Sequence, residues 1–300
     1  MKNYAEFAGI FPALLTPYTA DDKINEKALE ALIEYLLSAG VTGFYVGGST
    51  GEAFLLSEQE REGLYKTVAD IVNGRAKLIA HVGDVSLRKA QKYAVAAEKA
   101  GFDAVSAVTP FYYKFSETEI ESYYKGIVDA VSLPMFIYYI PLYTGAAPGN
   151  DMLSRLLSDE RFAGIKFTSG DFYKLTTLKR LFPDKVILNG FDEMFLSGLA
   201  AGATGGIGST YNLCPKLFIK IRELFLENRI PEAQILQRYA AQIVDTLLEL
   251  EVMPATKAAV SLKLGIDFGP CRAPFRKLGA DDINKIKTRI MPIVDKYQEV

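Results

Sequence analysis

Short apolar runs alternate with amphipathic segments along most of the chain. The apolar runs, which we expect to form strands, lie near residues 10–16, 43–47, 77–82, 103–108, 134–140, 162–168, 185–190 and 204–208. A segment with helical periodicity follows each of them, and these segments lie near residues 25–39, 57–72, 86–100, 117–131, 149–158, 171–182, 192–201 and 215–227. Eight alternations of strand and helix are typical of a closed parallel sheet. The pattern therefore predicts an α/β fold, specifically a (β/α)8 TIM barrel.

A repeated junction between helix and strand supports this prediction. The stretches "LLSAGVTGFYVGG", "AEKAGFDAVSAVTP" and "GLAAGATGGIGST" each end a helical segment with Ala-Gly and then begin a short apolar run. The glycines of these junctions, Gly40, Gly101 and Gly202, suit the left-handed position that closes a helix. Repetition of such a unit favours a parallel sheet.

The strand pattern ends near residue 227. Three helical segments follow, reading "PEAQILQRYAAQIVDTLLEL", "PATKAAVSLKLG" and "DDINKIKTRIMPIVDKY". We therefore expect a catalytic barrel over residues 1–227 and a C-terminal three-helix extension over residues 228–300. The extension is a candidate for packing between subunits.

Composition excludes several classes of partner. The chain has 300 residues, of which 49% are hydrophobic and 23% charged, and its formal net charge is -2. With this charge balance the sequence shows no basic patch of the kind that binds nucleic acid. No apolar run reaches the ~20 residues of a membrane span. We expect neither a nucleic acid nor a membrane as partner. Cys214 and Cys271 lack metal-ligand spacing, which favours a reducing compartment, so we expect a cytoplasmic protein.

The chain contains a single histidine, His81. A histidine-rich zinc site and an H-E-x-x-H helix are therefore excluded, and we expect neither a metal nor a cofactor. Because His81 lies in the middle of an expected strand, we predict a structural or supporting role for it. The chemistry must then come from lysine, tyrosine, serine, threonine or carboxylate groups.

The stretch "GIKFTSGD" places Lys166 at the end of the sixth apolar run. In a barrel the active site lies at the carboxyl ends of the strands. A lysine here can extend its ammonium group to solvent. Alternatively, an apolar pocket lowers its pKa, and the free amine attacks a ketone to give an iminium. If strands five and six are neighbours, Tyr138 meets Lys166, and Thr168 shares the same face of the strand.

Other strand ends carry small and acidic residues. "GGSTGE" offers the Ser49 and Thr50 hydroxyls with consecutive N–H groups that suit a carboxylate or phosphate, although a plain glycine turn has the same sequence. Asp192 and Glu193 fit either sugar hydroxyls or the first turn of a helix. The loop "GGIGSTYN" fits phosphate or a polyol equally well.

Several long motifs, in the same order, resemble the superfamily of Schiff-base aldolases that contains the N-acetylneuraminate lyases and dihydrodipicolinate synthases. The resemblance covers almost the whole chain and is closest to the lyase branch. The motifs that carry it are "GGSTGE", "FDAVSAVTPFYYKFS", "GIKFTSGDFYKL" and "NGFDEMFLSGLAAGATGGIGSTYN".

The resemblance implies roles for individual residues. Lys166 would form the Schiff base with the keto carbon of an open-chain sugar acid. Tyr138 would be the general acid and base that takes the C4 hydroxyl proton while the C3–C4 bond breaks. Ser49 and Thr50 would bind the pyruvate carboxylate, with Ser49 also in the proton relay, and Tyr112 would complete the network around Tyr138.

The same resemblance implies a sugar site and an assembly. Thr168 would join the network around the tyrosine, and the sugar portion would be held by Gly190, Asp192, Glu193 and Ser209. The products would be pyruvate and N-acetylmannosamine, formed reversibly without a cofactor. The family is typically homotetrameric, so we expect a homotetramer.

Four alternatives stay open at this point. The synthase branch carries an arginine shortly after the tyrosine of strand five, whereas Tyr143 stands at that place here. Bulky residues at Tyr139, Leu142 and Tyr143 leave other 2-keto-3-deoxy sugar acids possible as substrates. A catalytically lapsed binding barrel would require loss of Lys166 or its partners, and all of these are present. A phosphate-binding isomerase would expect a catalytic carboxylate, often with a histidine at a strand end.

Overall fold

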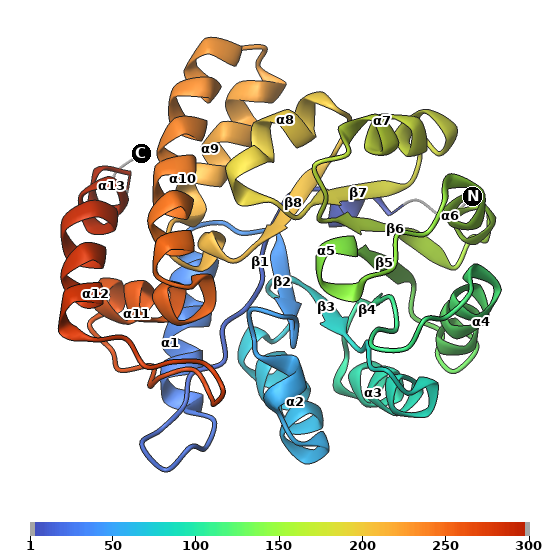
Figure 1. Ribbon diagram of the computed structural model, residues 1–300, viewed down its shortest axis with the longest axis horizontal. Helices are drawn as coiled ribbons and strands as arrows, with labels where there is room; N and C mark the ends of the chain where they lie inside the picture. The colour runs from blue at the N-terminus through green and yellow to red at the C-terminus, as the bar shows by residue number, and fades with distance from the viewer. Residues whose placement is uncertain (1–3, 298–300) are drawn as a thin grey trace.

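A closed ring of parallel strands forms the centre of the molecule (Figure 1). The computed structural model describes residues 4–297. The strands are β1 (Ile10–Pro12), β2 (Gly43–Val46), β3 (Lys77–His81), β4 (Ala104–Val108), β5 (Met135–Tyr139), β6 (Phe162–Phe167), β7 (Val186–Asn189) and β8 (Gly205–Gly208). Their order is β1-β8-β7-β6-β5-β4-β3-β2, and a parallel bridge between Ala13 and Tyr45 joins β1 to β2. The predicted (β/α)8 barrel is confirmed.

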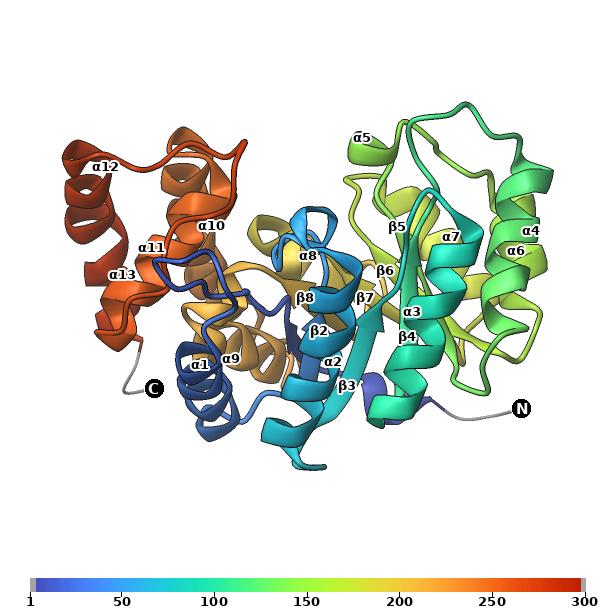
Figure 2. The same cartoon turned by 90° about the horizontal axis from the view of Figure 1, so that it is seen from below.

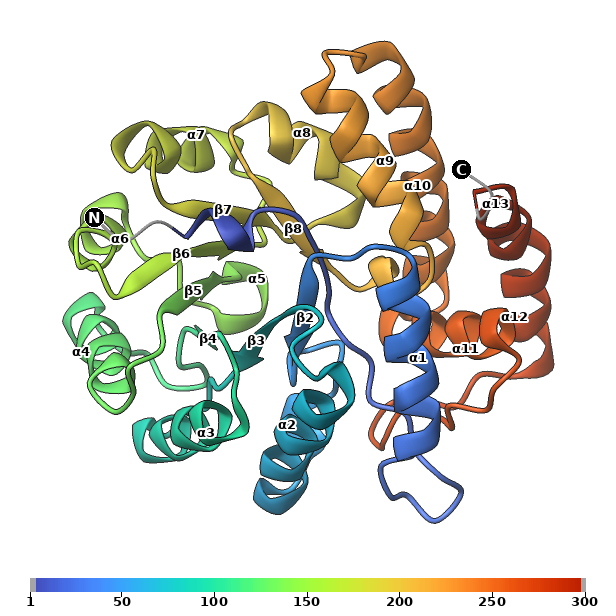
Figure 3. The same cartoon turned by 180° about the vertical axis from the view of Figure 1, so that it is seen from behind.

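The barrel helices surround this ring on the outside (Figures 1 and 3). They are α1 (Glu26–Ser38), α2 (Glu58–Val72), α3 (Leu87–Ala100), α4 (Glu117–Val128), α6 (Asn150–Leu157), α7 (Phe172–Leu181), α8 (Phe195–Ala200) and α9 (Pro215–Leu226). Side chains that accept a hydrogen bond from the first turn begin several of them, at Asn25, Ser57, Ser86, Ser116 and Asp171. Local capping chemistry thus sets many of the predicted boundaries.

Several short helices were not predicted. Helix α5 (Pro141–Thr144) follows β5, and 3-10 turns occur at η1 (Ala5–Phe7), η2 (Ala53–Leu55), η3 (Asp192–Met194) and η4 (Thr210–Asn212). The helix expected over 192–201 is in fact η3 followed by α8. Short turns lack the periodicity that predicts longer helices.

The C-terminal segment forms the expected three helices. They are α10 (Ile230–Glu249), α11 (Val252–Leu264), and a final run made of α12 (Ala280–Lys285), the π-helical turn η5 (Ile286–Ile290) and α13 (Met291–Lys296). Figure 2 shows this group beside the barrel, with α10 next to α9. The domain boundary after residue 227 stays a prediction. Within residues 4–297, no helix combines the length and apolarity needed to span a bilayer.

Two apolar layers position the site. The larger core lies between the strands and the surrounding helices, and a smaller one fills the barrel interior. Phe7 of η1 enters this interior and packs edge-on against Phe136, with ring centroids 5.3 Å apart. Large side chains therefore fill the barrel below the carboxyl ends of the strands and leave space only above them.

Asn212 fastens the last strand to the first. Its Nδ2 donates to the carbonyls of Ala13 at 2.7 Å and Ser209 at 2.9 Å, and its Oδ1 accepts from the N–H of Leu15 at 3.3 Å. The side chain is fully buried. Water cannot easily replace these bonds, because the groups they satisfy lie inside the molecule.

We expect Asn212→Ala to lower the free energy of unfolding by about 3 kcal/mol, because it leaves buried backbone groups without partners. Urea denaturation would measure the change. The matched control is Asn284→Ala at an exposed helical position, for which we expect a change of at most about 0.5 kcal/mol. Equal effects of the two substitutions would contradict the proposed role of Asn212.

Candidate active site

A cavity of about 300 Å³ opens at the carboxyl ends of the strands. It brings together nearly all of the predicted site residues, from strands and loops far apart in the sequence. Those that line it are Ser49, Thr50, Tyr138, Lys166, Thr168, Gly190, Asp192, Glu193 and Ser209. Tyr112 is the predicted residue that does not line it.

Lys166 points into the barrel. It pairs directly with Tyr138 in the β5–β6 register, so both side chains leave the sheet on the same face. The residue is 4% exposed, which excludes the solvent-directed lysine considered from the sequence. Its Nζ lies 4.0 Å from the ring centroid of Tyr138 and 4.2 Å from that of Tyr45.

The surroundings of Lys166 favour the neutral amine. Burial lowers its pKa to about 7, and the nearby carboxylate of Asp192 opposes part of that shift. A substantial fraction of the side chain is therefore the free amine at neutral pH. That form is a nucleophile toward carbonyl carbon.

Tyr138 is a phenol with hydroxyl neighbours. Burial raises its pKa to about 12, and the adjacent hydroxyls of Ser49 and Thr168 oppose part of the rise. The group is thus protonated at neutral pH and can donate a proton. The same hydroxyls would stabilise the phenolate when it forms.

The turn after β2 presents the Ser49 and Thr50 hydroxyls to the cavity. Gly47 begins this turn with φ +67°, a left-handed conformation that favours glycine. The Oγ1 atom of Thr50 lies 2.7 Å from Oγ of Ser209, so the turn after β2 is joined to the turn after β8. Together, these hydroxyls and backbone amides can hold a carboxylate.

Asp192 is buried, and one of its two carboxylate oxygens accepts hydrogen bonds from the protein. Its Oδ2 accepts hydrogen bonds from the N–H and the hydroxyl of Thr210, at 2.8 Å and 2.6 Å. Its Oδ1 is buried without a hydrogen-bond partner among the described residues. Burial raises the pKa of Asp192 to about 6, and the bonds from Thr210 oppose that rise. The free oxygen can accept a hydrogen bond from a ligand hydroxyl.

Two further polar groups extend the same wall. Oγ1 of Thr168 lies beside the Tyr138 phenol but gains no hydrogen bond of normal geometry within the described part of the chain. Gly190 is required next to it, because a Cβ there would come within 1.9 Å of Thr168 Oγ1. Glu193 is partly buried, and its burial raises its pKa.

Tyr112 lies apart from the other predicted site residues in the single chain. Its side chain is 85% exposed and lies outside the cavity, so it does not join the network around Tyr138 within one chain. Its backbone is left-handed, with φ +77°. The loop that carries it follows β4.

Sequence reasoning missed several contributors. Tyr45 covers one side of the lysine amine, and the alternation of β2 could have indicated its inward direction. His81 lies within 2.9 Å of the Gly47 carbonyl through Nδ1, in the supporting position predicted for it. The apolar wall combines α5 with the C-terminal helices. The sequence indicated the bulky residues Leu142 and Tyr143, whereas the other members had no local signal: Val244, Leu247, Leu248, Val252 and Met253.

Gln237 of α10 also contributes from a distance. Its Nε2 donates to the carbonyls of Asp192 and Glu193 at 3.1 Å and 2.9 Å, and its Oε1 accepts from the N–H of Leu196 at 2.8 Å. The C-terminal helices therefore hold the acidic turn in place as well as forming part of the cavity wall.

The lowered pKa of Lys166 predicts a pH-dependent stability. The pKa falls from 10.5 to about 7 on folding, so between these values the unfolded chain binds a proton that the folded chain lacks. Stability contributed by this group therefore rises with pH across that window. We expect Lys166→Met to be more stable than the parent chain near neutral pH, with a gap that shrinks toward pH 10 by at most about 1.4 kcal/mol per unit.

Urea denaturation of both chains at several pH values above 7.5 would measure this gap, above the pKa of about 6 of Asp192. Lys287→Met, at an exposed position, is the control for removing a lysine from the surface. A constant gap for Lys166→Met would show that the amine is not held neutral.

Comparisons with known proteins agree with this geometry. The pattern of the dihydrodipicolinate synthetase family matches residues 6–292. The N-acetylneuraminate lyase of Rhizobium meliloti (strain 1021) is 39% identical over 286 residues, which cover 95% of each chain. The structure of CdNal from Clostridium difficile in complex with mannosamine has a TM-score of 0.92 at 37% identity and covers 97% of this chain and 99% of that one.

A second solved structure contains a different bound molecule, pyruvate. The N-acetylneuraminate lyase of Fusobacterium nucleatum, complexed with pyruvate, has a TM-score of 0.91 at 36% identity and covers 99% of each chain. The matches extend over almost the whole chain, as the motifs in the sequence indicated. This chain belongs to the dihydrodipicolinate synthetase family.

Proposed function

We propose that this protein is an N-acetylneuraminate lyase, which reversibly cleaves N-acetylneuraminate to pyruvate and N-acetylmannosamine through a Schiff base. The observation that carries the proposal is the buried Lys166 amine, paired in register with Tyr138 in a cavity that Ser49 and Thr50 also line. Family membership and the lyase relatives support the same chemistry.

The first step joins the substrate to the lysine. Ser49 and Thr50 bind the carboxylate, which directs the adjacent keto carbon toward Lys166. The neutral amine adds to that carbon, the resulting carbinolamine loses one water, and a protonated imine remains. Tyr138 supplies the proton that helps the hydroxyl leave.

The second step breaks the bond between C3 and C4. The phenolate of Tyr138, stabilised by the adjacent cationic imine, takes the proton of the C4 hydroxyl. The electrons of that O–H bond form the C4 carbonyl, and those of the C3–C4 bond move into the iminium to give an enamine. Protonation of C3 and hydrolysis then release pyruvate and restore the amine.

The polar wall suits a neutral sugar chain. Asp192 Oδ1 and Thr168 Oγ1 are buried without protein partners in residues 4–297, so substrate hydroxyls can satisfy both. Glu193 and Ser209 extend this wall. A carboxylated aldehyde would meet two acidic side chains and no arginine, because Tyr143 occupies the edge of the cavity. This argues against the synthase reaction.

We further propose that the working form is a cytoplasmic homotetramer and that Tyr112 acts from a neighbouring subunit. The exposed fractions of Tyr112, Tyr113 and Tyr143 are 85%, 63% and 66% in the single chain. Large exposed aromatic side chains are enriched at protein interfaces. Such an interface would explain why Tyr112 turns away from its own cavity.

Borohydride trapping tests the lysine step. We expect N-acetylneuraminate and pyruvate each to leave a pyruvate-sized adduct on Lys166 after reduction, located by peptide mass spectrometry. Lys166→Ala should form no adduct and lose all measurable turnover, because no other lysine of residues 4–297 lines the cavity. An adduct from pyruvate alone would reject N-acetylneuraminate as the substrate, and no adduct from either would reject the Schiff-base mechanism.

Substitution of Tyr138 tests its proposed role in proton transfer independently of carboxylate binding. We expect Tyr138→Phe to lower kcat by roughly 100-fold or more, the usual contribution of a general acid and base. Pyruvate should still saturate Lys166 trapping at a similar concentration, since the carboxylate contacts remain. Steady-state kinetics and trapping would measure the two quantities. Unchanged kcat would assign the proton transfer to another group.

A further inference from the structure

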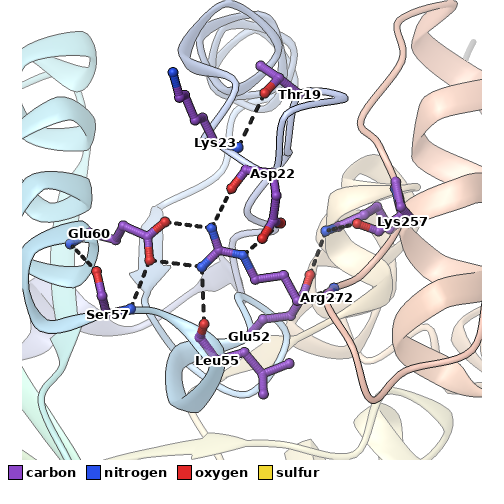
Figure 4. Close-up of polar contacts among 10 residues, drawn as sticks. Thr19, Asp22, Lys23, Glu52, Leu55, Ser57, Glu60, Lys257 and Arg272 are labelled. Carbon is purple, nitrogen blue, oxygen red and sulfur yellow. Dashed lines mark hydrogen bonds and ion pairs between the residues drawn. The ribbon is translucent and has the colours of Figure 1, made fainter.

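A charged cluster lies next to the turn that carries Ser49 and Thr50, and Figure 4 shows its members Glu52, Lys257 and Arg272. At its centre the carboxylate of Glu52 meets two partners from the C-terminal region. Oε1 accepts from Lys257 Nζ at 2.5 Å, and Oε2 accepts from the backbone N–H of Arg272 at 2.7 Å. The Glu52 and Lys257 side chains are 0% and 1% exposed. The proposed chemistry uses none of these three residues.

The position of Glu52 is unfavourable by local criteria. Its backbone has φ +59°, in the left-handed region where glycine or asparagine is ordinarily found. A buried ion pair is also costly, because both charges lose their hydration. A turn can form without a left-handed glutamate and without a buried ion pair. These two costs therefore point to a role for the carboxylate itself.

Short contacts connect Glu52 to the cavity. Its N–H donates to the carbonyl of Ser49 at 3.0 Å. The carbonyl of Gly51, the next residue back, accepts from the Thr16 hydroxyl at 2.8 Å. Any displacement of Glu52 would therefore move the Ser49 backbone and the Thr50 hydroxyl that faces the cavity.

Arg272 fixes the outer side of the same cluster. Its guanidinium bonds to both carboxylate oxygens of Glu60, at 2.8 Å and 2.5 Å, and to Asp22 Oδ1 at 3.0 Å. It also donates to the carbonyl of Leu55 at 3.0 Å. Figure 4 shows this guanidinium between the start of α2 and the loop after β1. The segment that offers its N–H to Glu52 is thus held from several directions.

An aromatic ring completes the arrangement. Lys257 Nζ lies 4.2 Å from the ring centroid of Tyr18, and the Arg272 guanidinium carbon lies 4.5 Å from it. Tyr18 is 2% exposed. Lys257, which pairs with Glu52, and Arg272, whose guanidinium pairs with Glu60 and Asp22, are therefore both held by packing as well as by charge.

We propose that Glu52 is a positioning residue that, through Lys257 and Arg272, sets the Ser49–Thr50 turn for the substrate carboxylate. The inference rests on the proposed function, since the turn needs its geometry only if it binds that group. The C-terminal segment then takes part in substrate binding without touching the substrate.

The test uses the full chain and compares two ketones that form the same imine on Lys166. Pyruvate carries the carboxylate, and acetone lacks it. The test variant is Glu52→Gly/Lys257→Met, because glycine accepts the left-handed backbone and removing both charges leaves no unpaired ion. The concentration of each ketone that half-saturates cyanoborohydride trapping is measured.

We expect the half-saturating pyruvate concentration to rise about tenfold, the effect of weakening a hydrogen bond to a charged group, while that of acetone changes less than about twofold. Glu52→Gln/Lys257→Met carries the test if the first variant does not fold, with an expected rise of about threefold for pyruvate. Val72→Ala, at a buried position near the opposite end of α2, controls for general destabilisation and should leave the ratio of the two ketones unchanged.

Two results would overturn the proposal. The first is a ratio of the half-saturating pyruvate and acetone concentrations that stays unchanged in both double variants, as it does when both ketones lose equally. The second is a change in this ratio that Val72→Ala produces to the same degree. The parent chain decides the underlying function separately, because absence of a pyruvate adduct on its Lys166 would reject the Schiff base and the positioning role together.

Discussion

The active end of this barrel depends on keeping one amine out of water. Lys166 lies under two aromatic faces, with its nitrogen 4.0 Å and 4.2 Å from their centroids. Moving an ammonium ion into such a place is costly, and the side chain responds by releasing its proton more easily. The same aromatic faces would stabilise the cationic imine proposed for this nitrogen, because their ring electrons attract positive charge. The barrel supplies this environment only above its filled interior.

The sequence predicted the barrel because each level of its pattern agreed with the next. The apolar runs, the helical periodicity and the glycines at Gly40, Gly101 and Gly202 all indicate the same repeated unit. Most of the site followed from that fold, since parallel strands bring their carboxyl ends to one edge. The pairing of Tyr138 with Lys166 could thus be predicted from strand order alone.

What sequence reasoning missed is set by contacts between distant segments. Gln237 reaches the acidic turn from more than forty residues away, and nothing near it in the sequence indicates that contact. Tyr112 shows the opposite limit, because a motif can identify a residue without showing where its loop directs the side chain. Short elements such as α5 also escaped, as one turn has no periodicity to detect.

The motif "GGSTGE" shows why residues that bind a ligand and residues that support them are hard to tell apart from the sequence alone. Ser49 and Thr50 stand out as hydroxyls in a glycine turn, whereas Glu52 looks like an ordinary surface acid. Only the fold reveals that its carboxylate is buried against α11 and the segment beyond it. A glycine-rich turn that we propose to hold an anion gains definition from such a contact with another part of the chain.

The charges in the cavity favour a cationic imine over the neutral amine. Before reaction the cavity holds a lysine whose pKa is about 7 and an aspartate whose pKa is about 6, and a substrate carboxylate adds another negative charge. A neutral amine leaves that charge uncompensated, whereas the protonated imine compensates it directly. Binding of the carboxylate therefore favours the cationic intermediate, and burial increases the effect because the surrounding dielectric is low. In the proposed mechanism, the substrate carboxylate that the Ser49–Thr50 turn binds thus also stabilises the intermediate from which the carbon–carbon bond breaks.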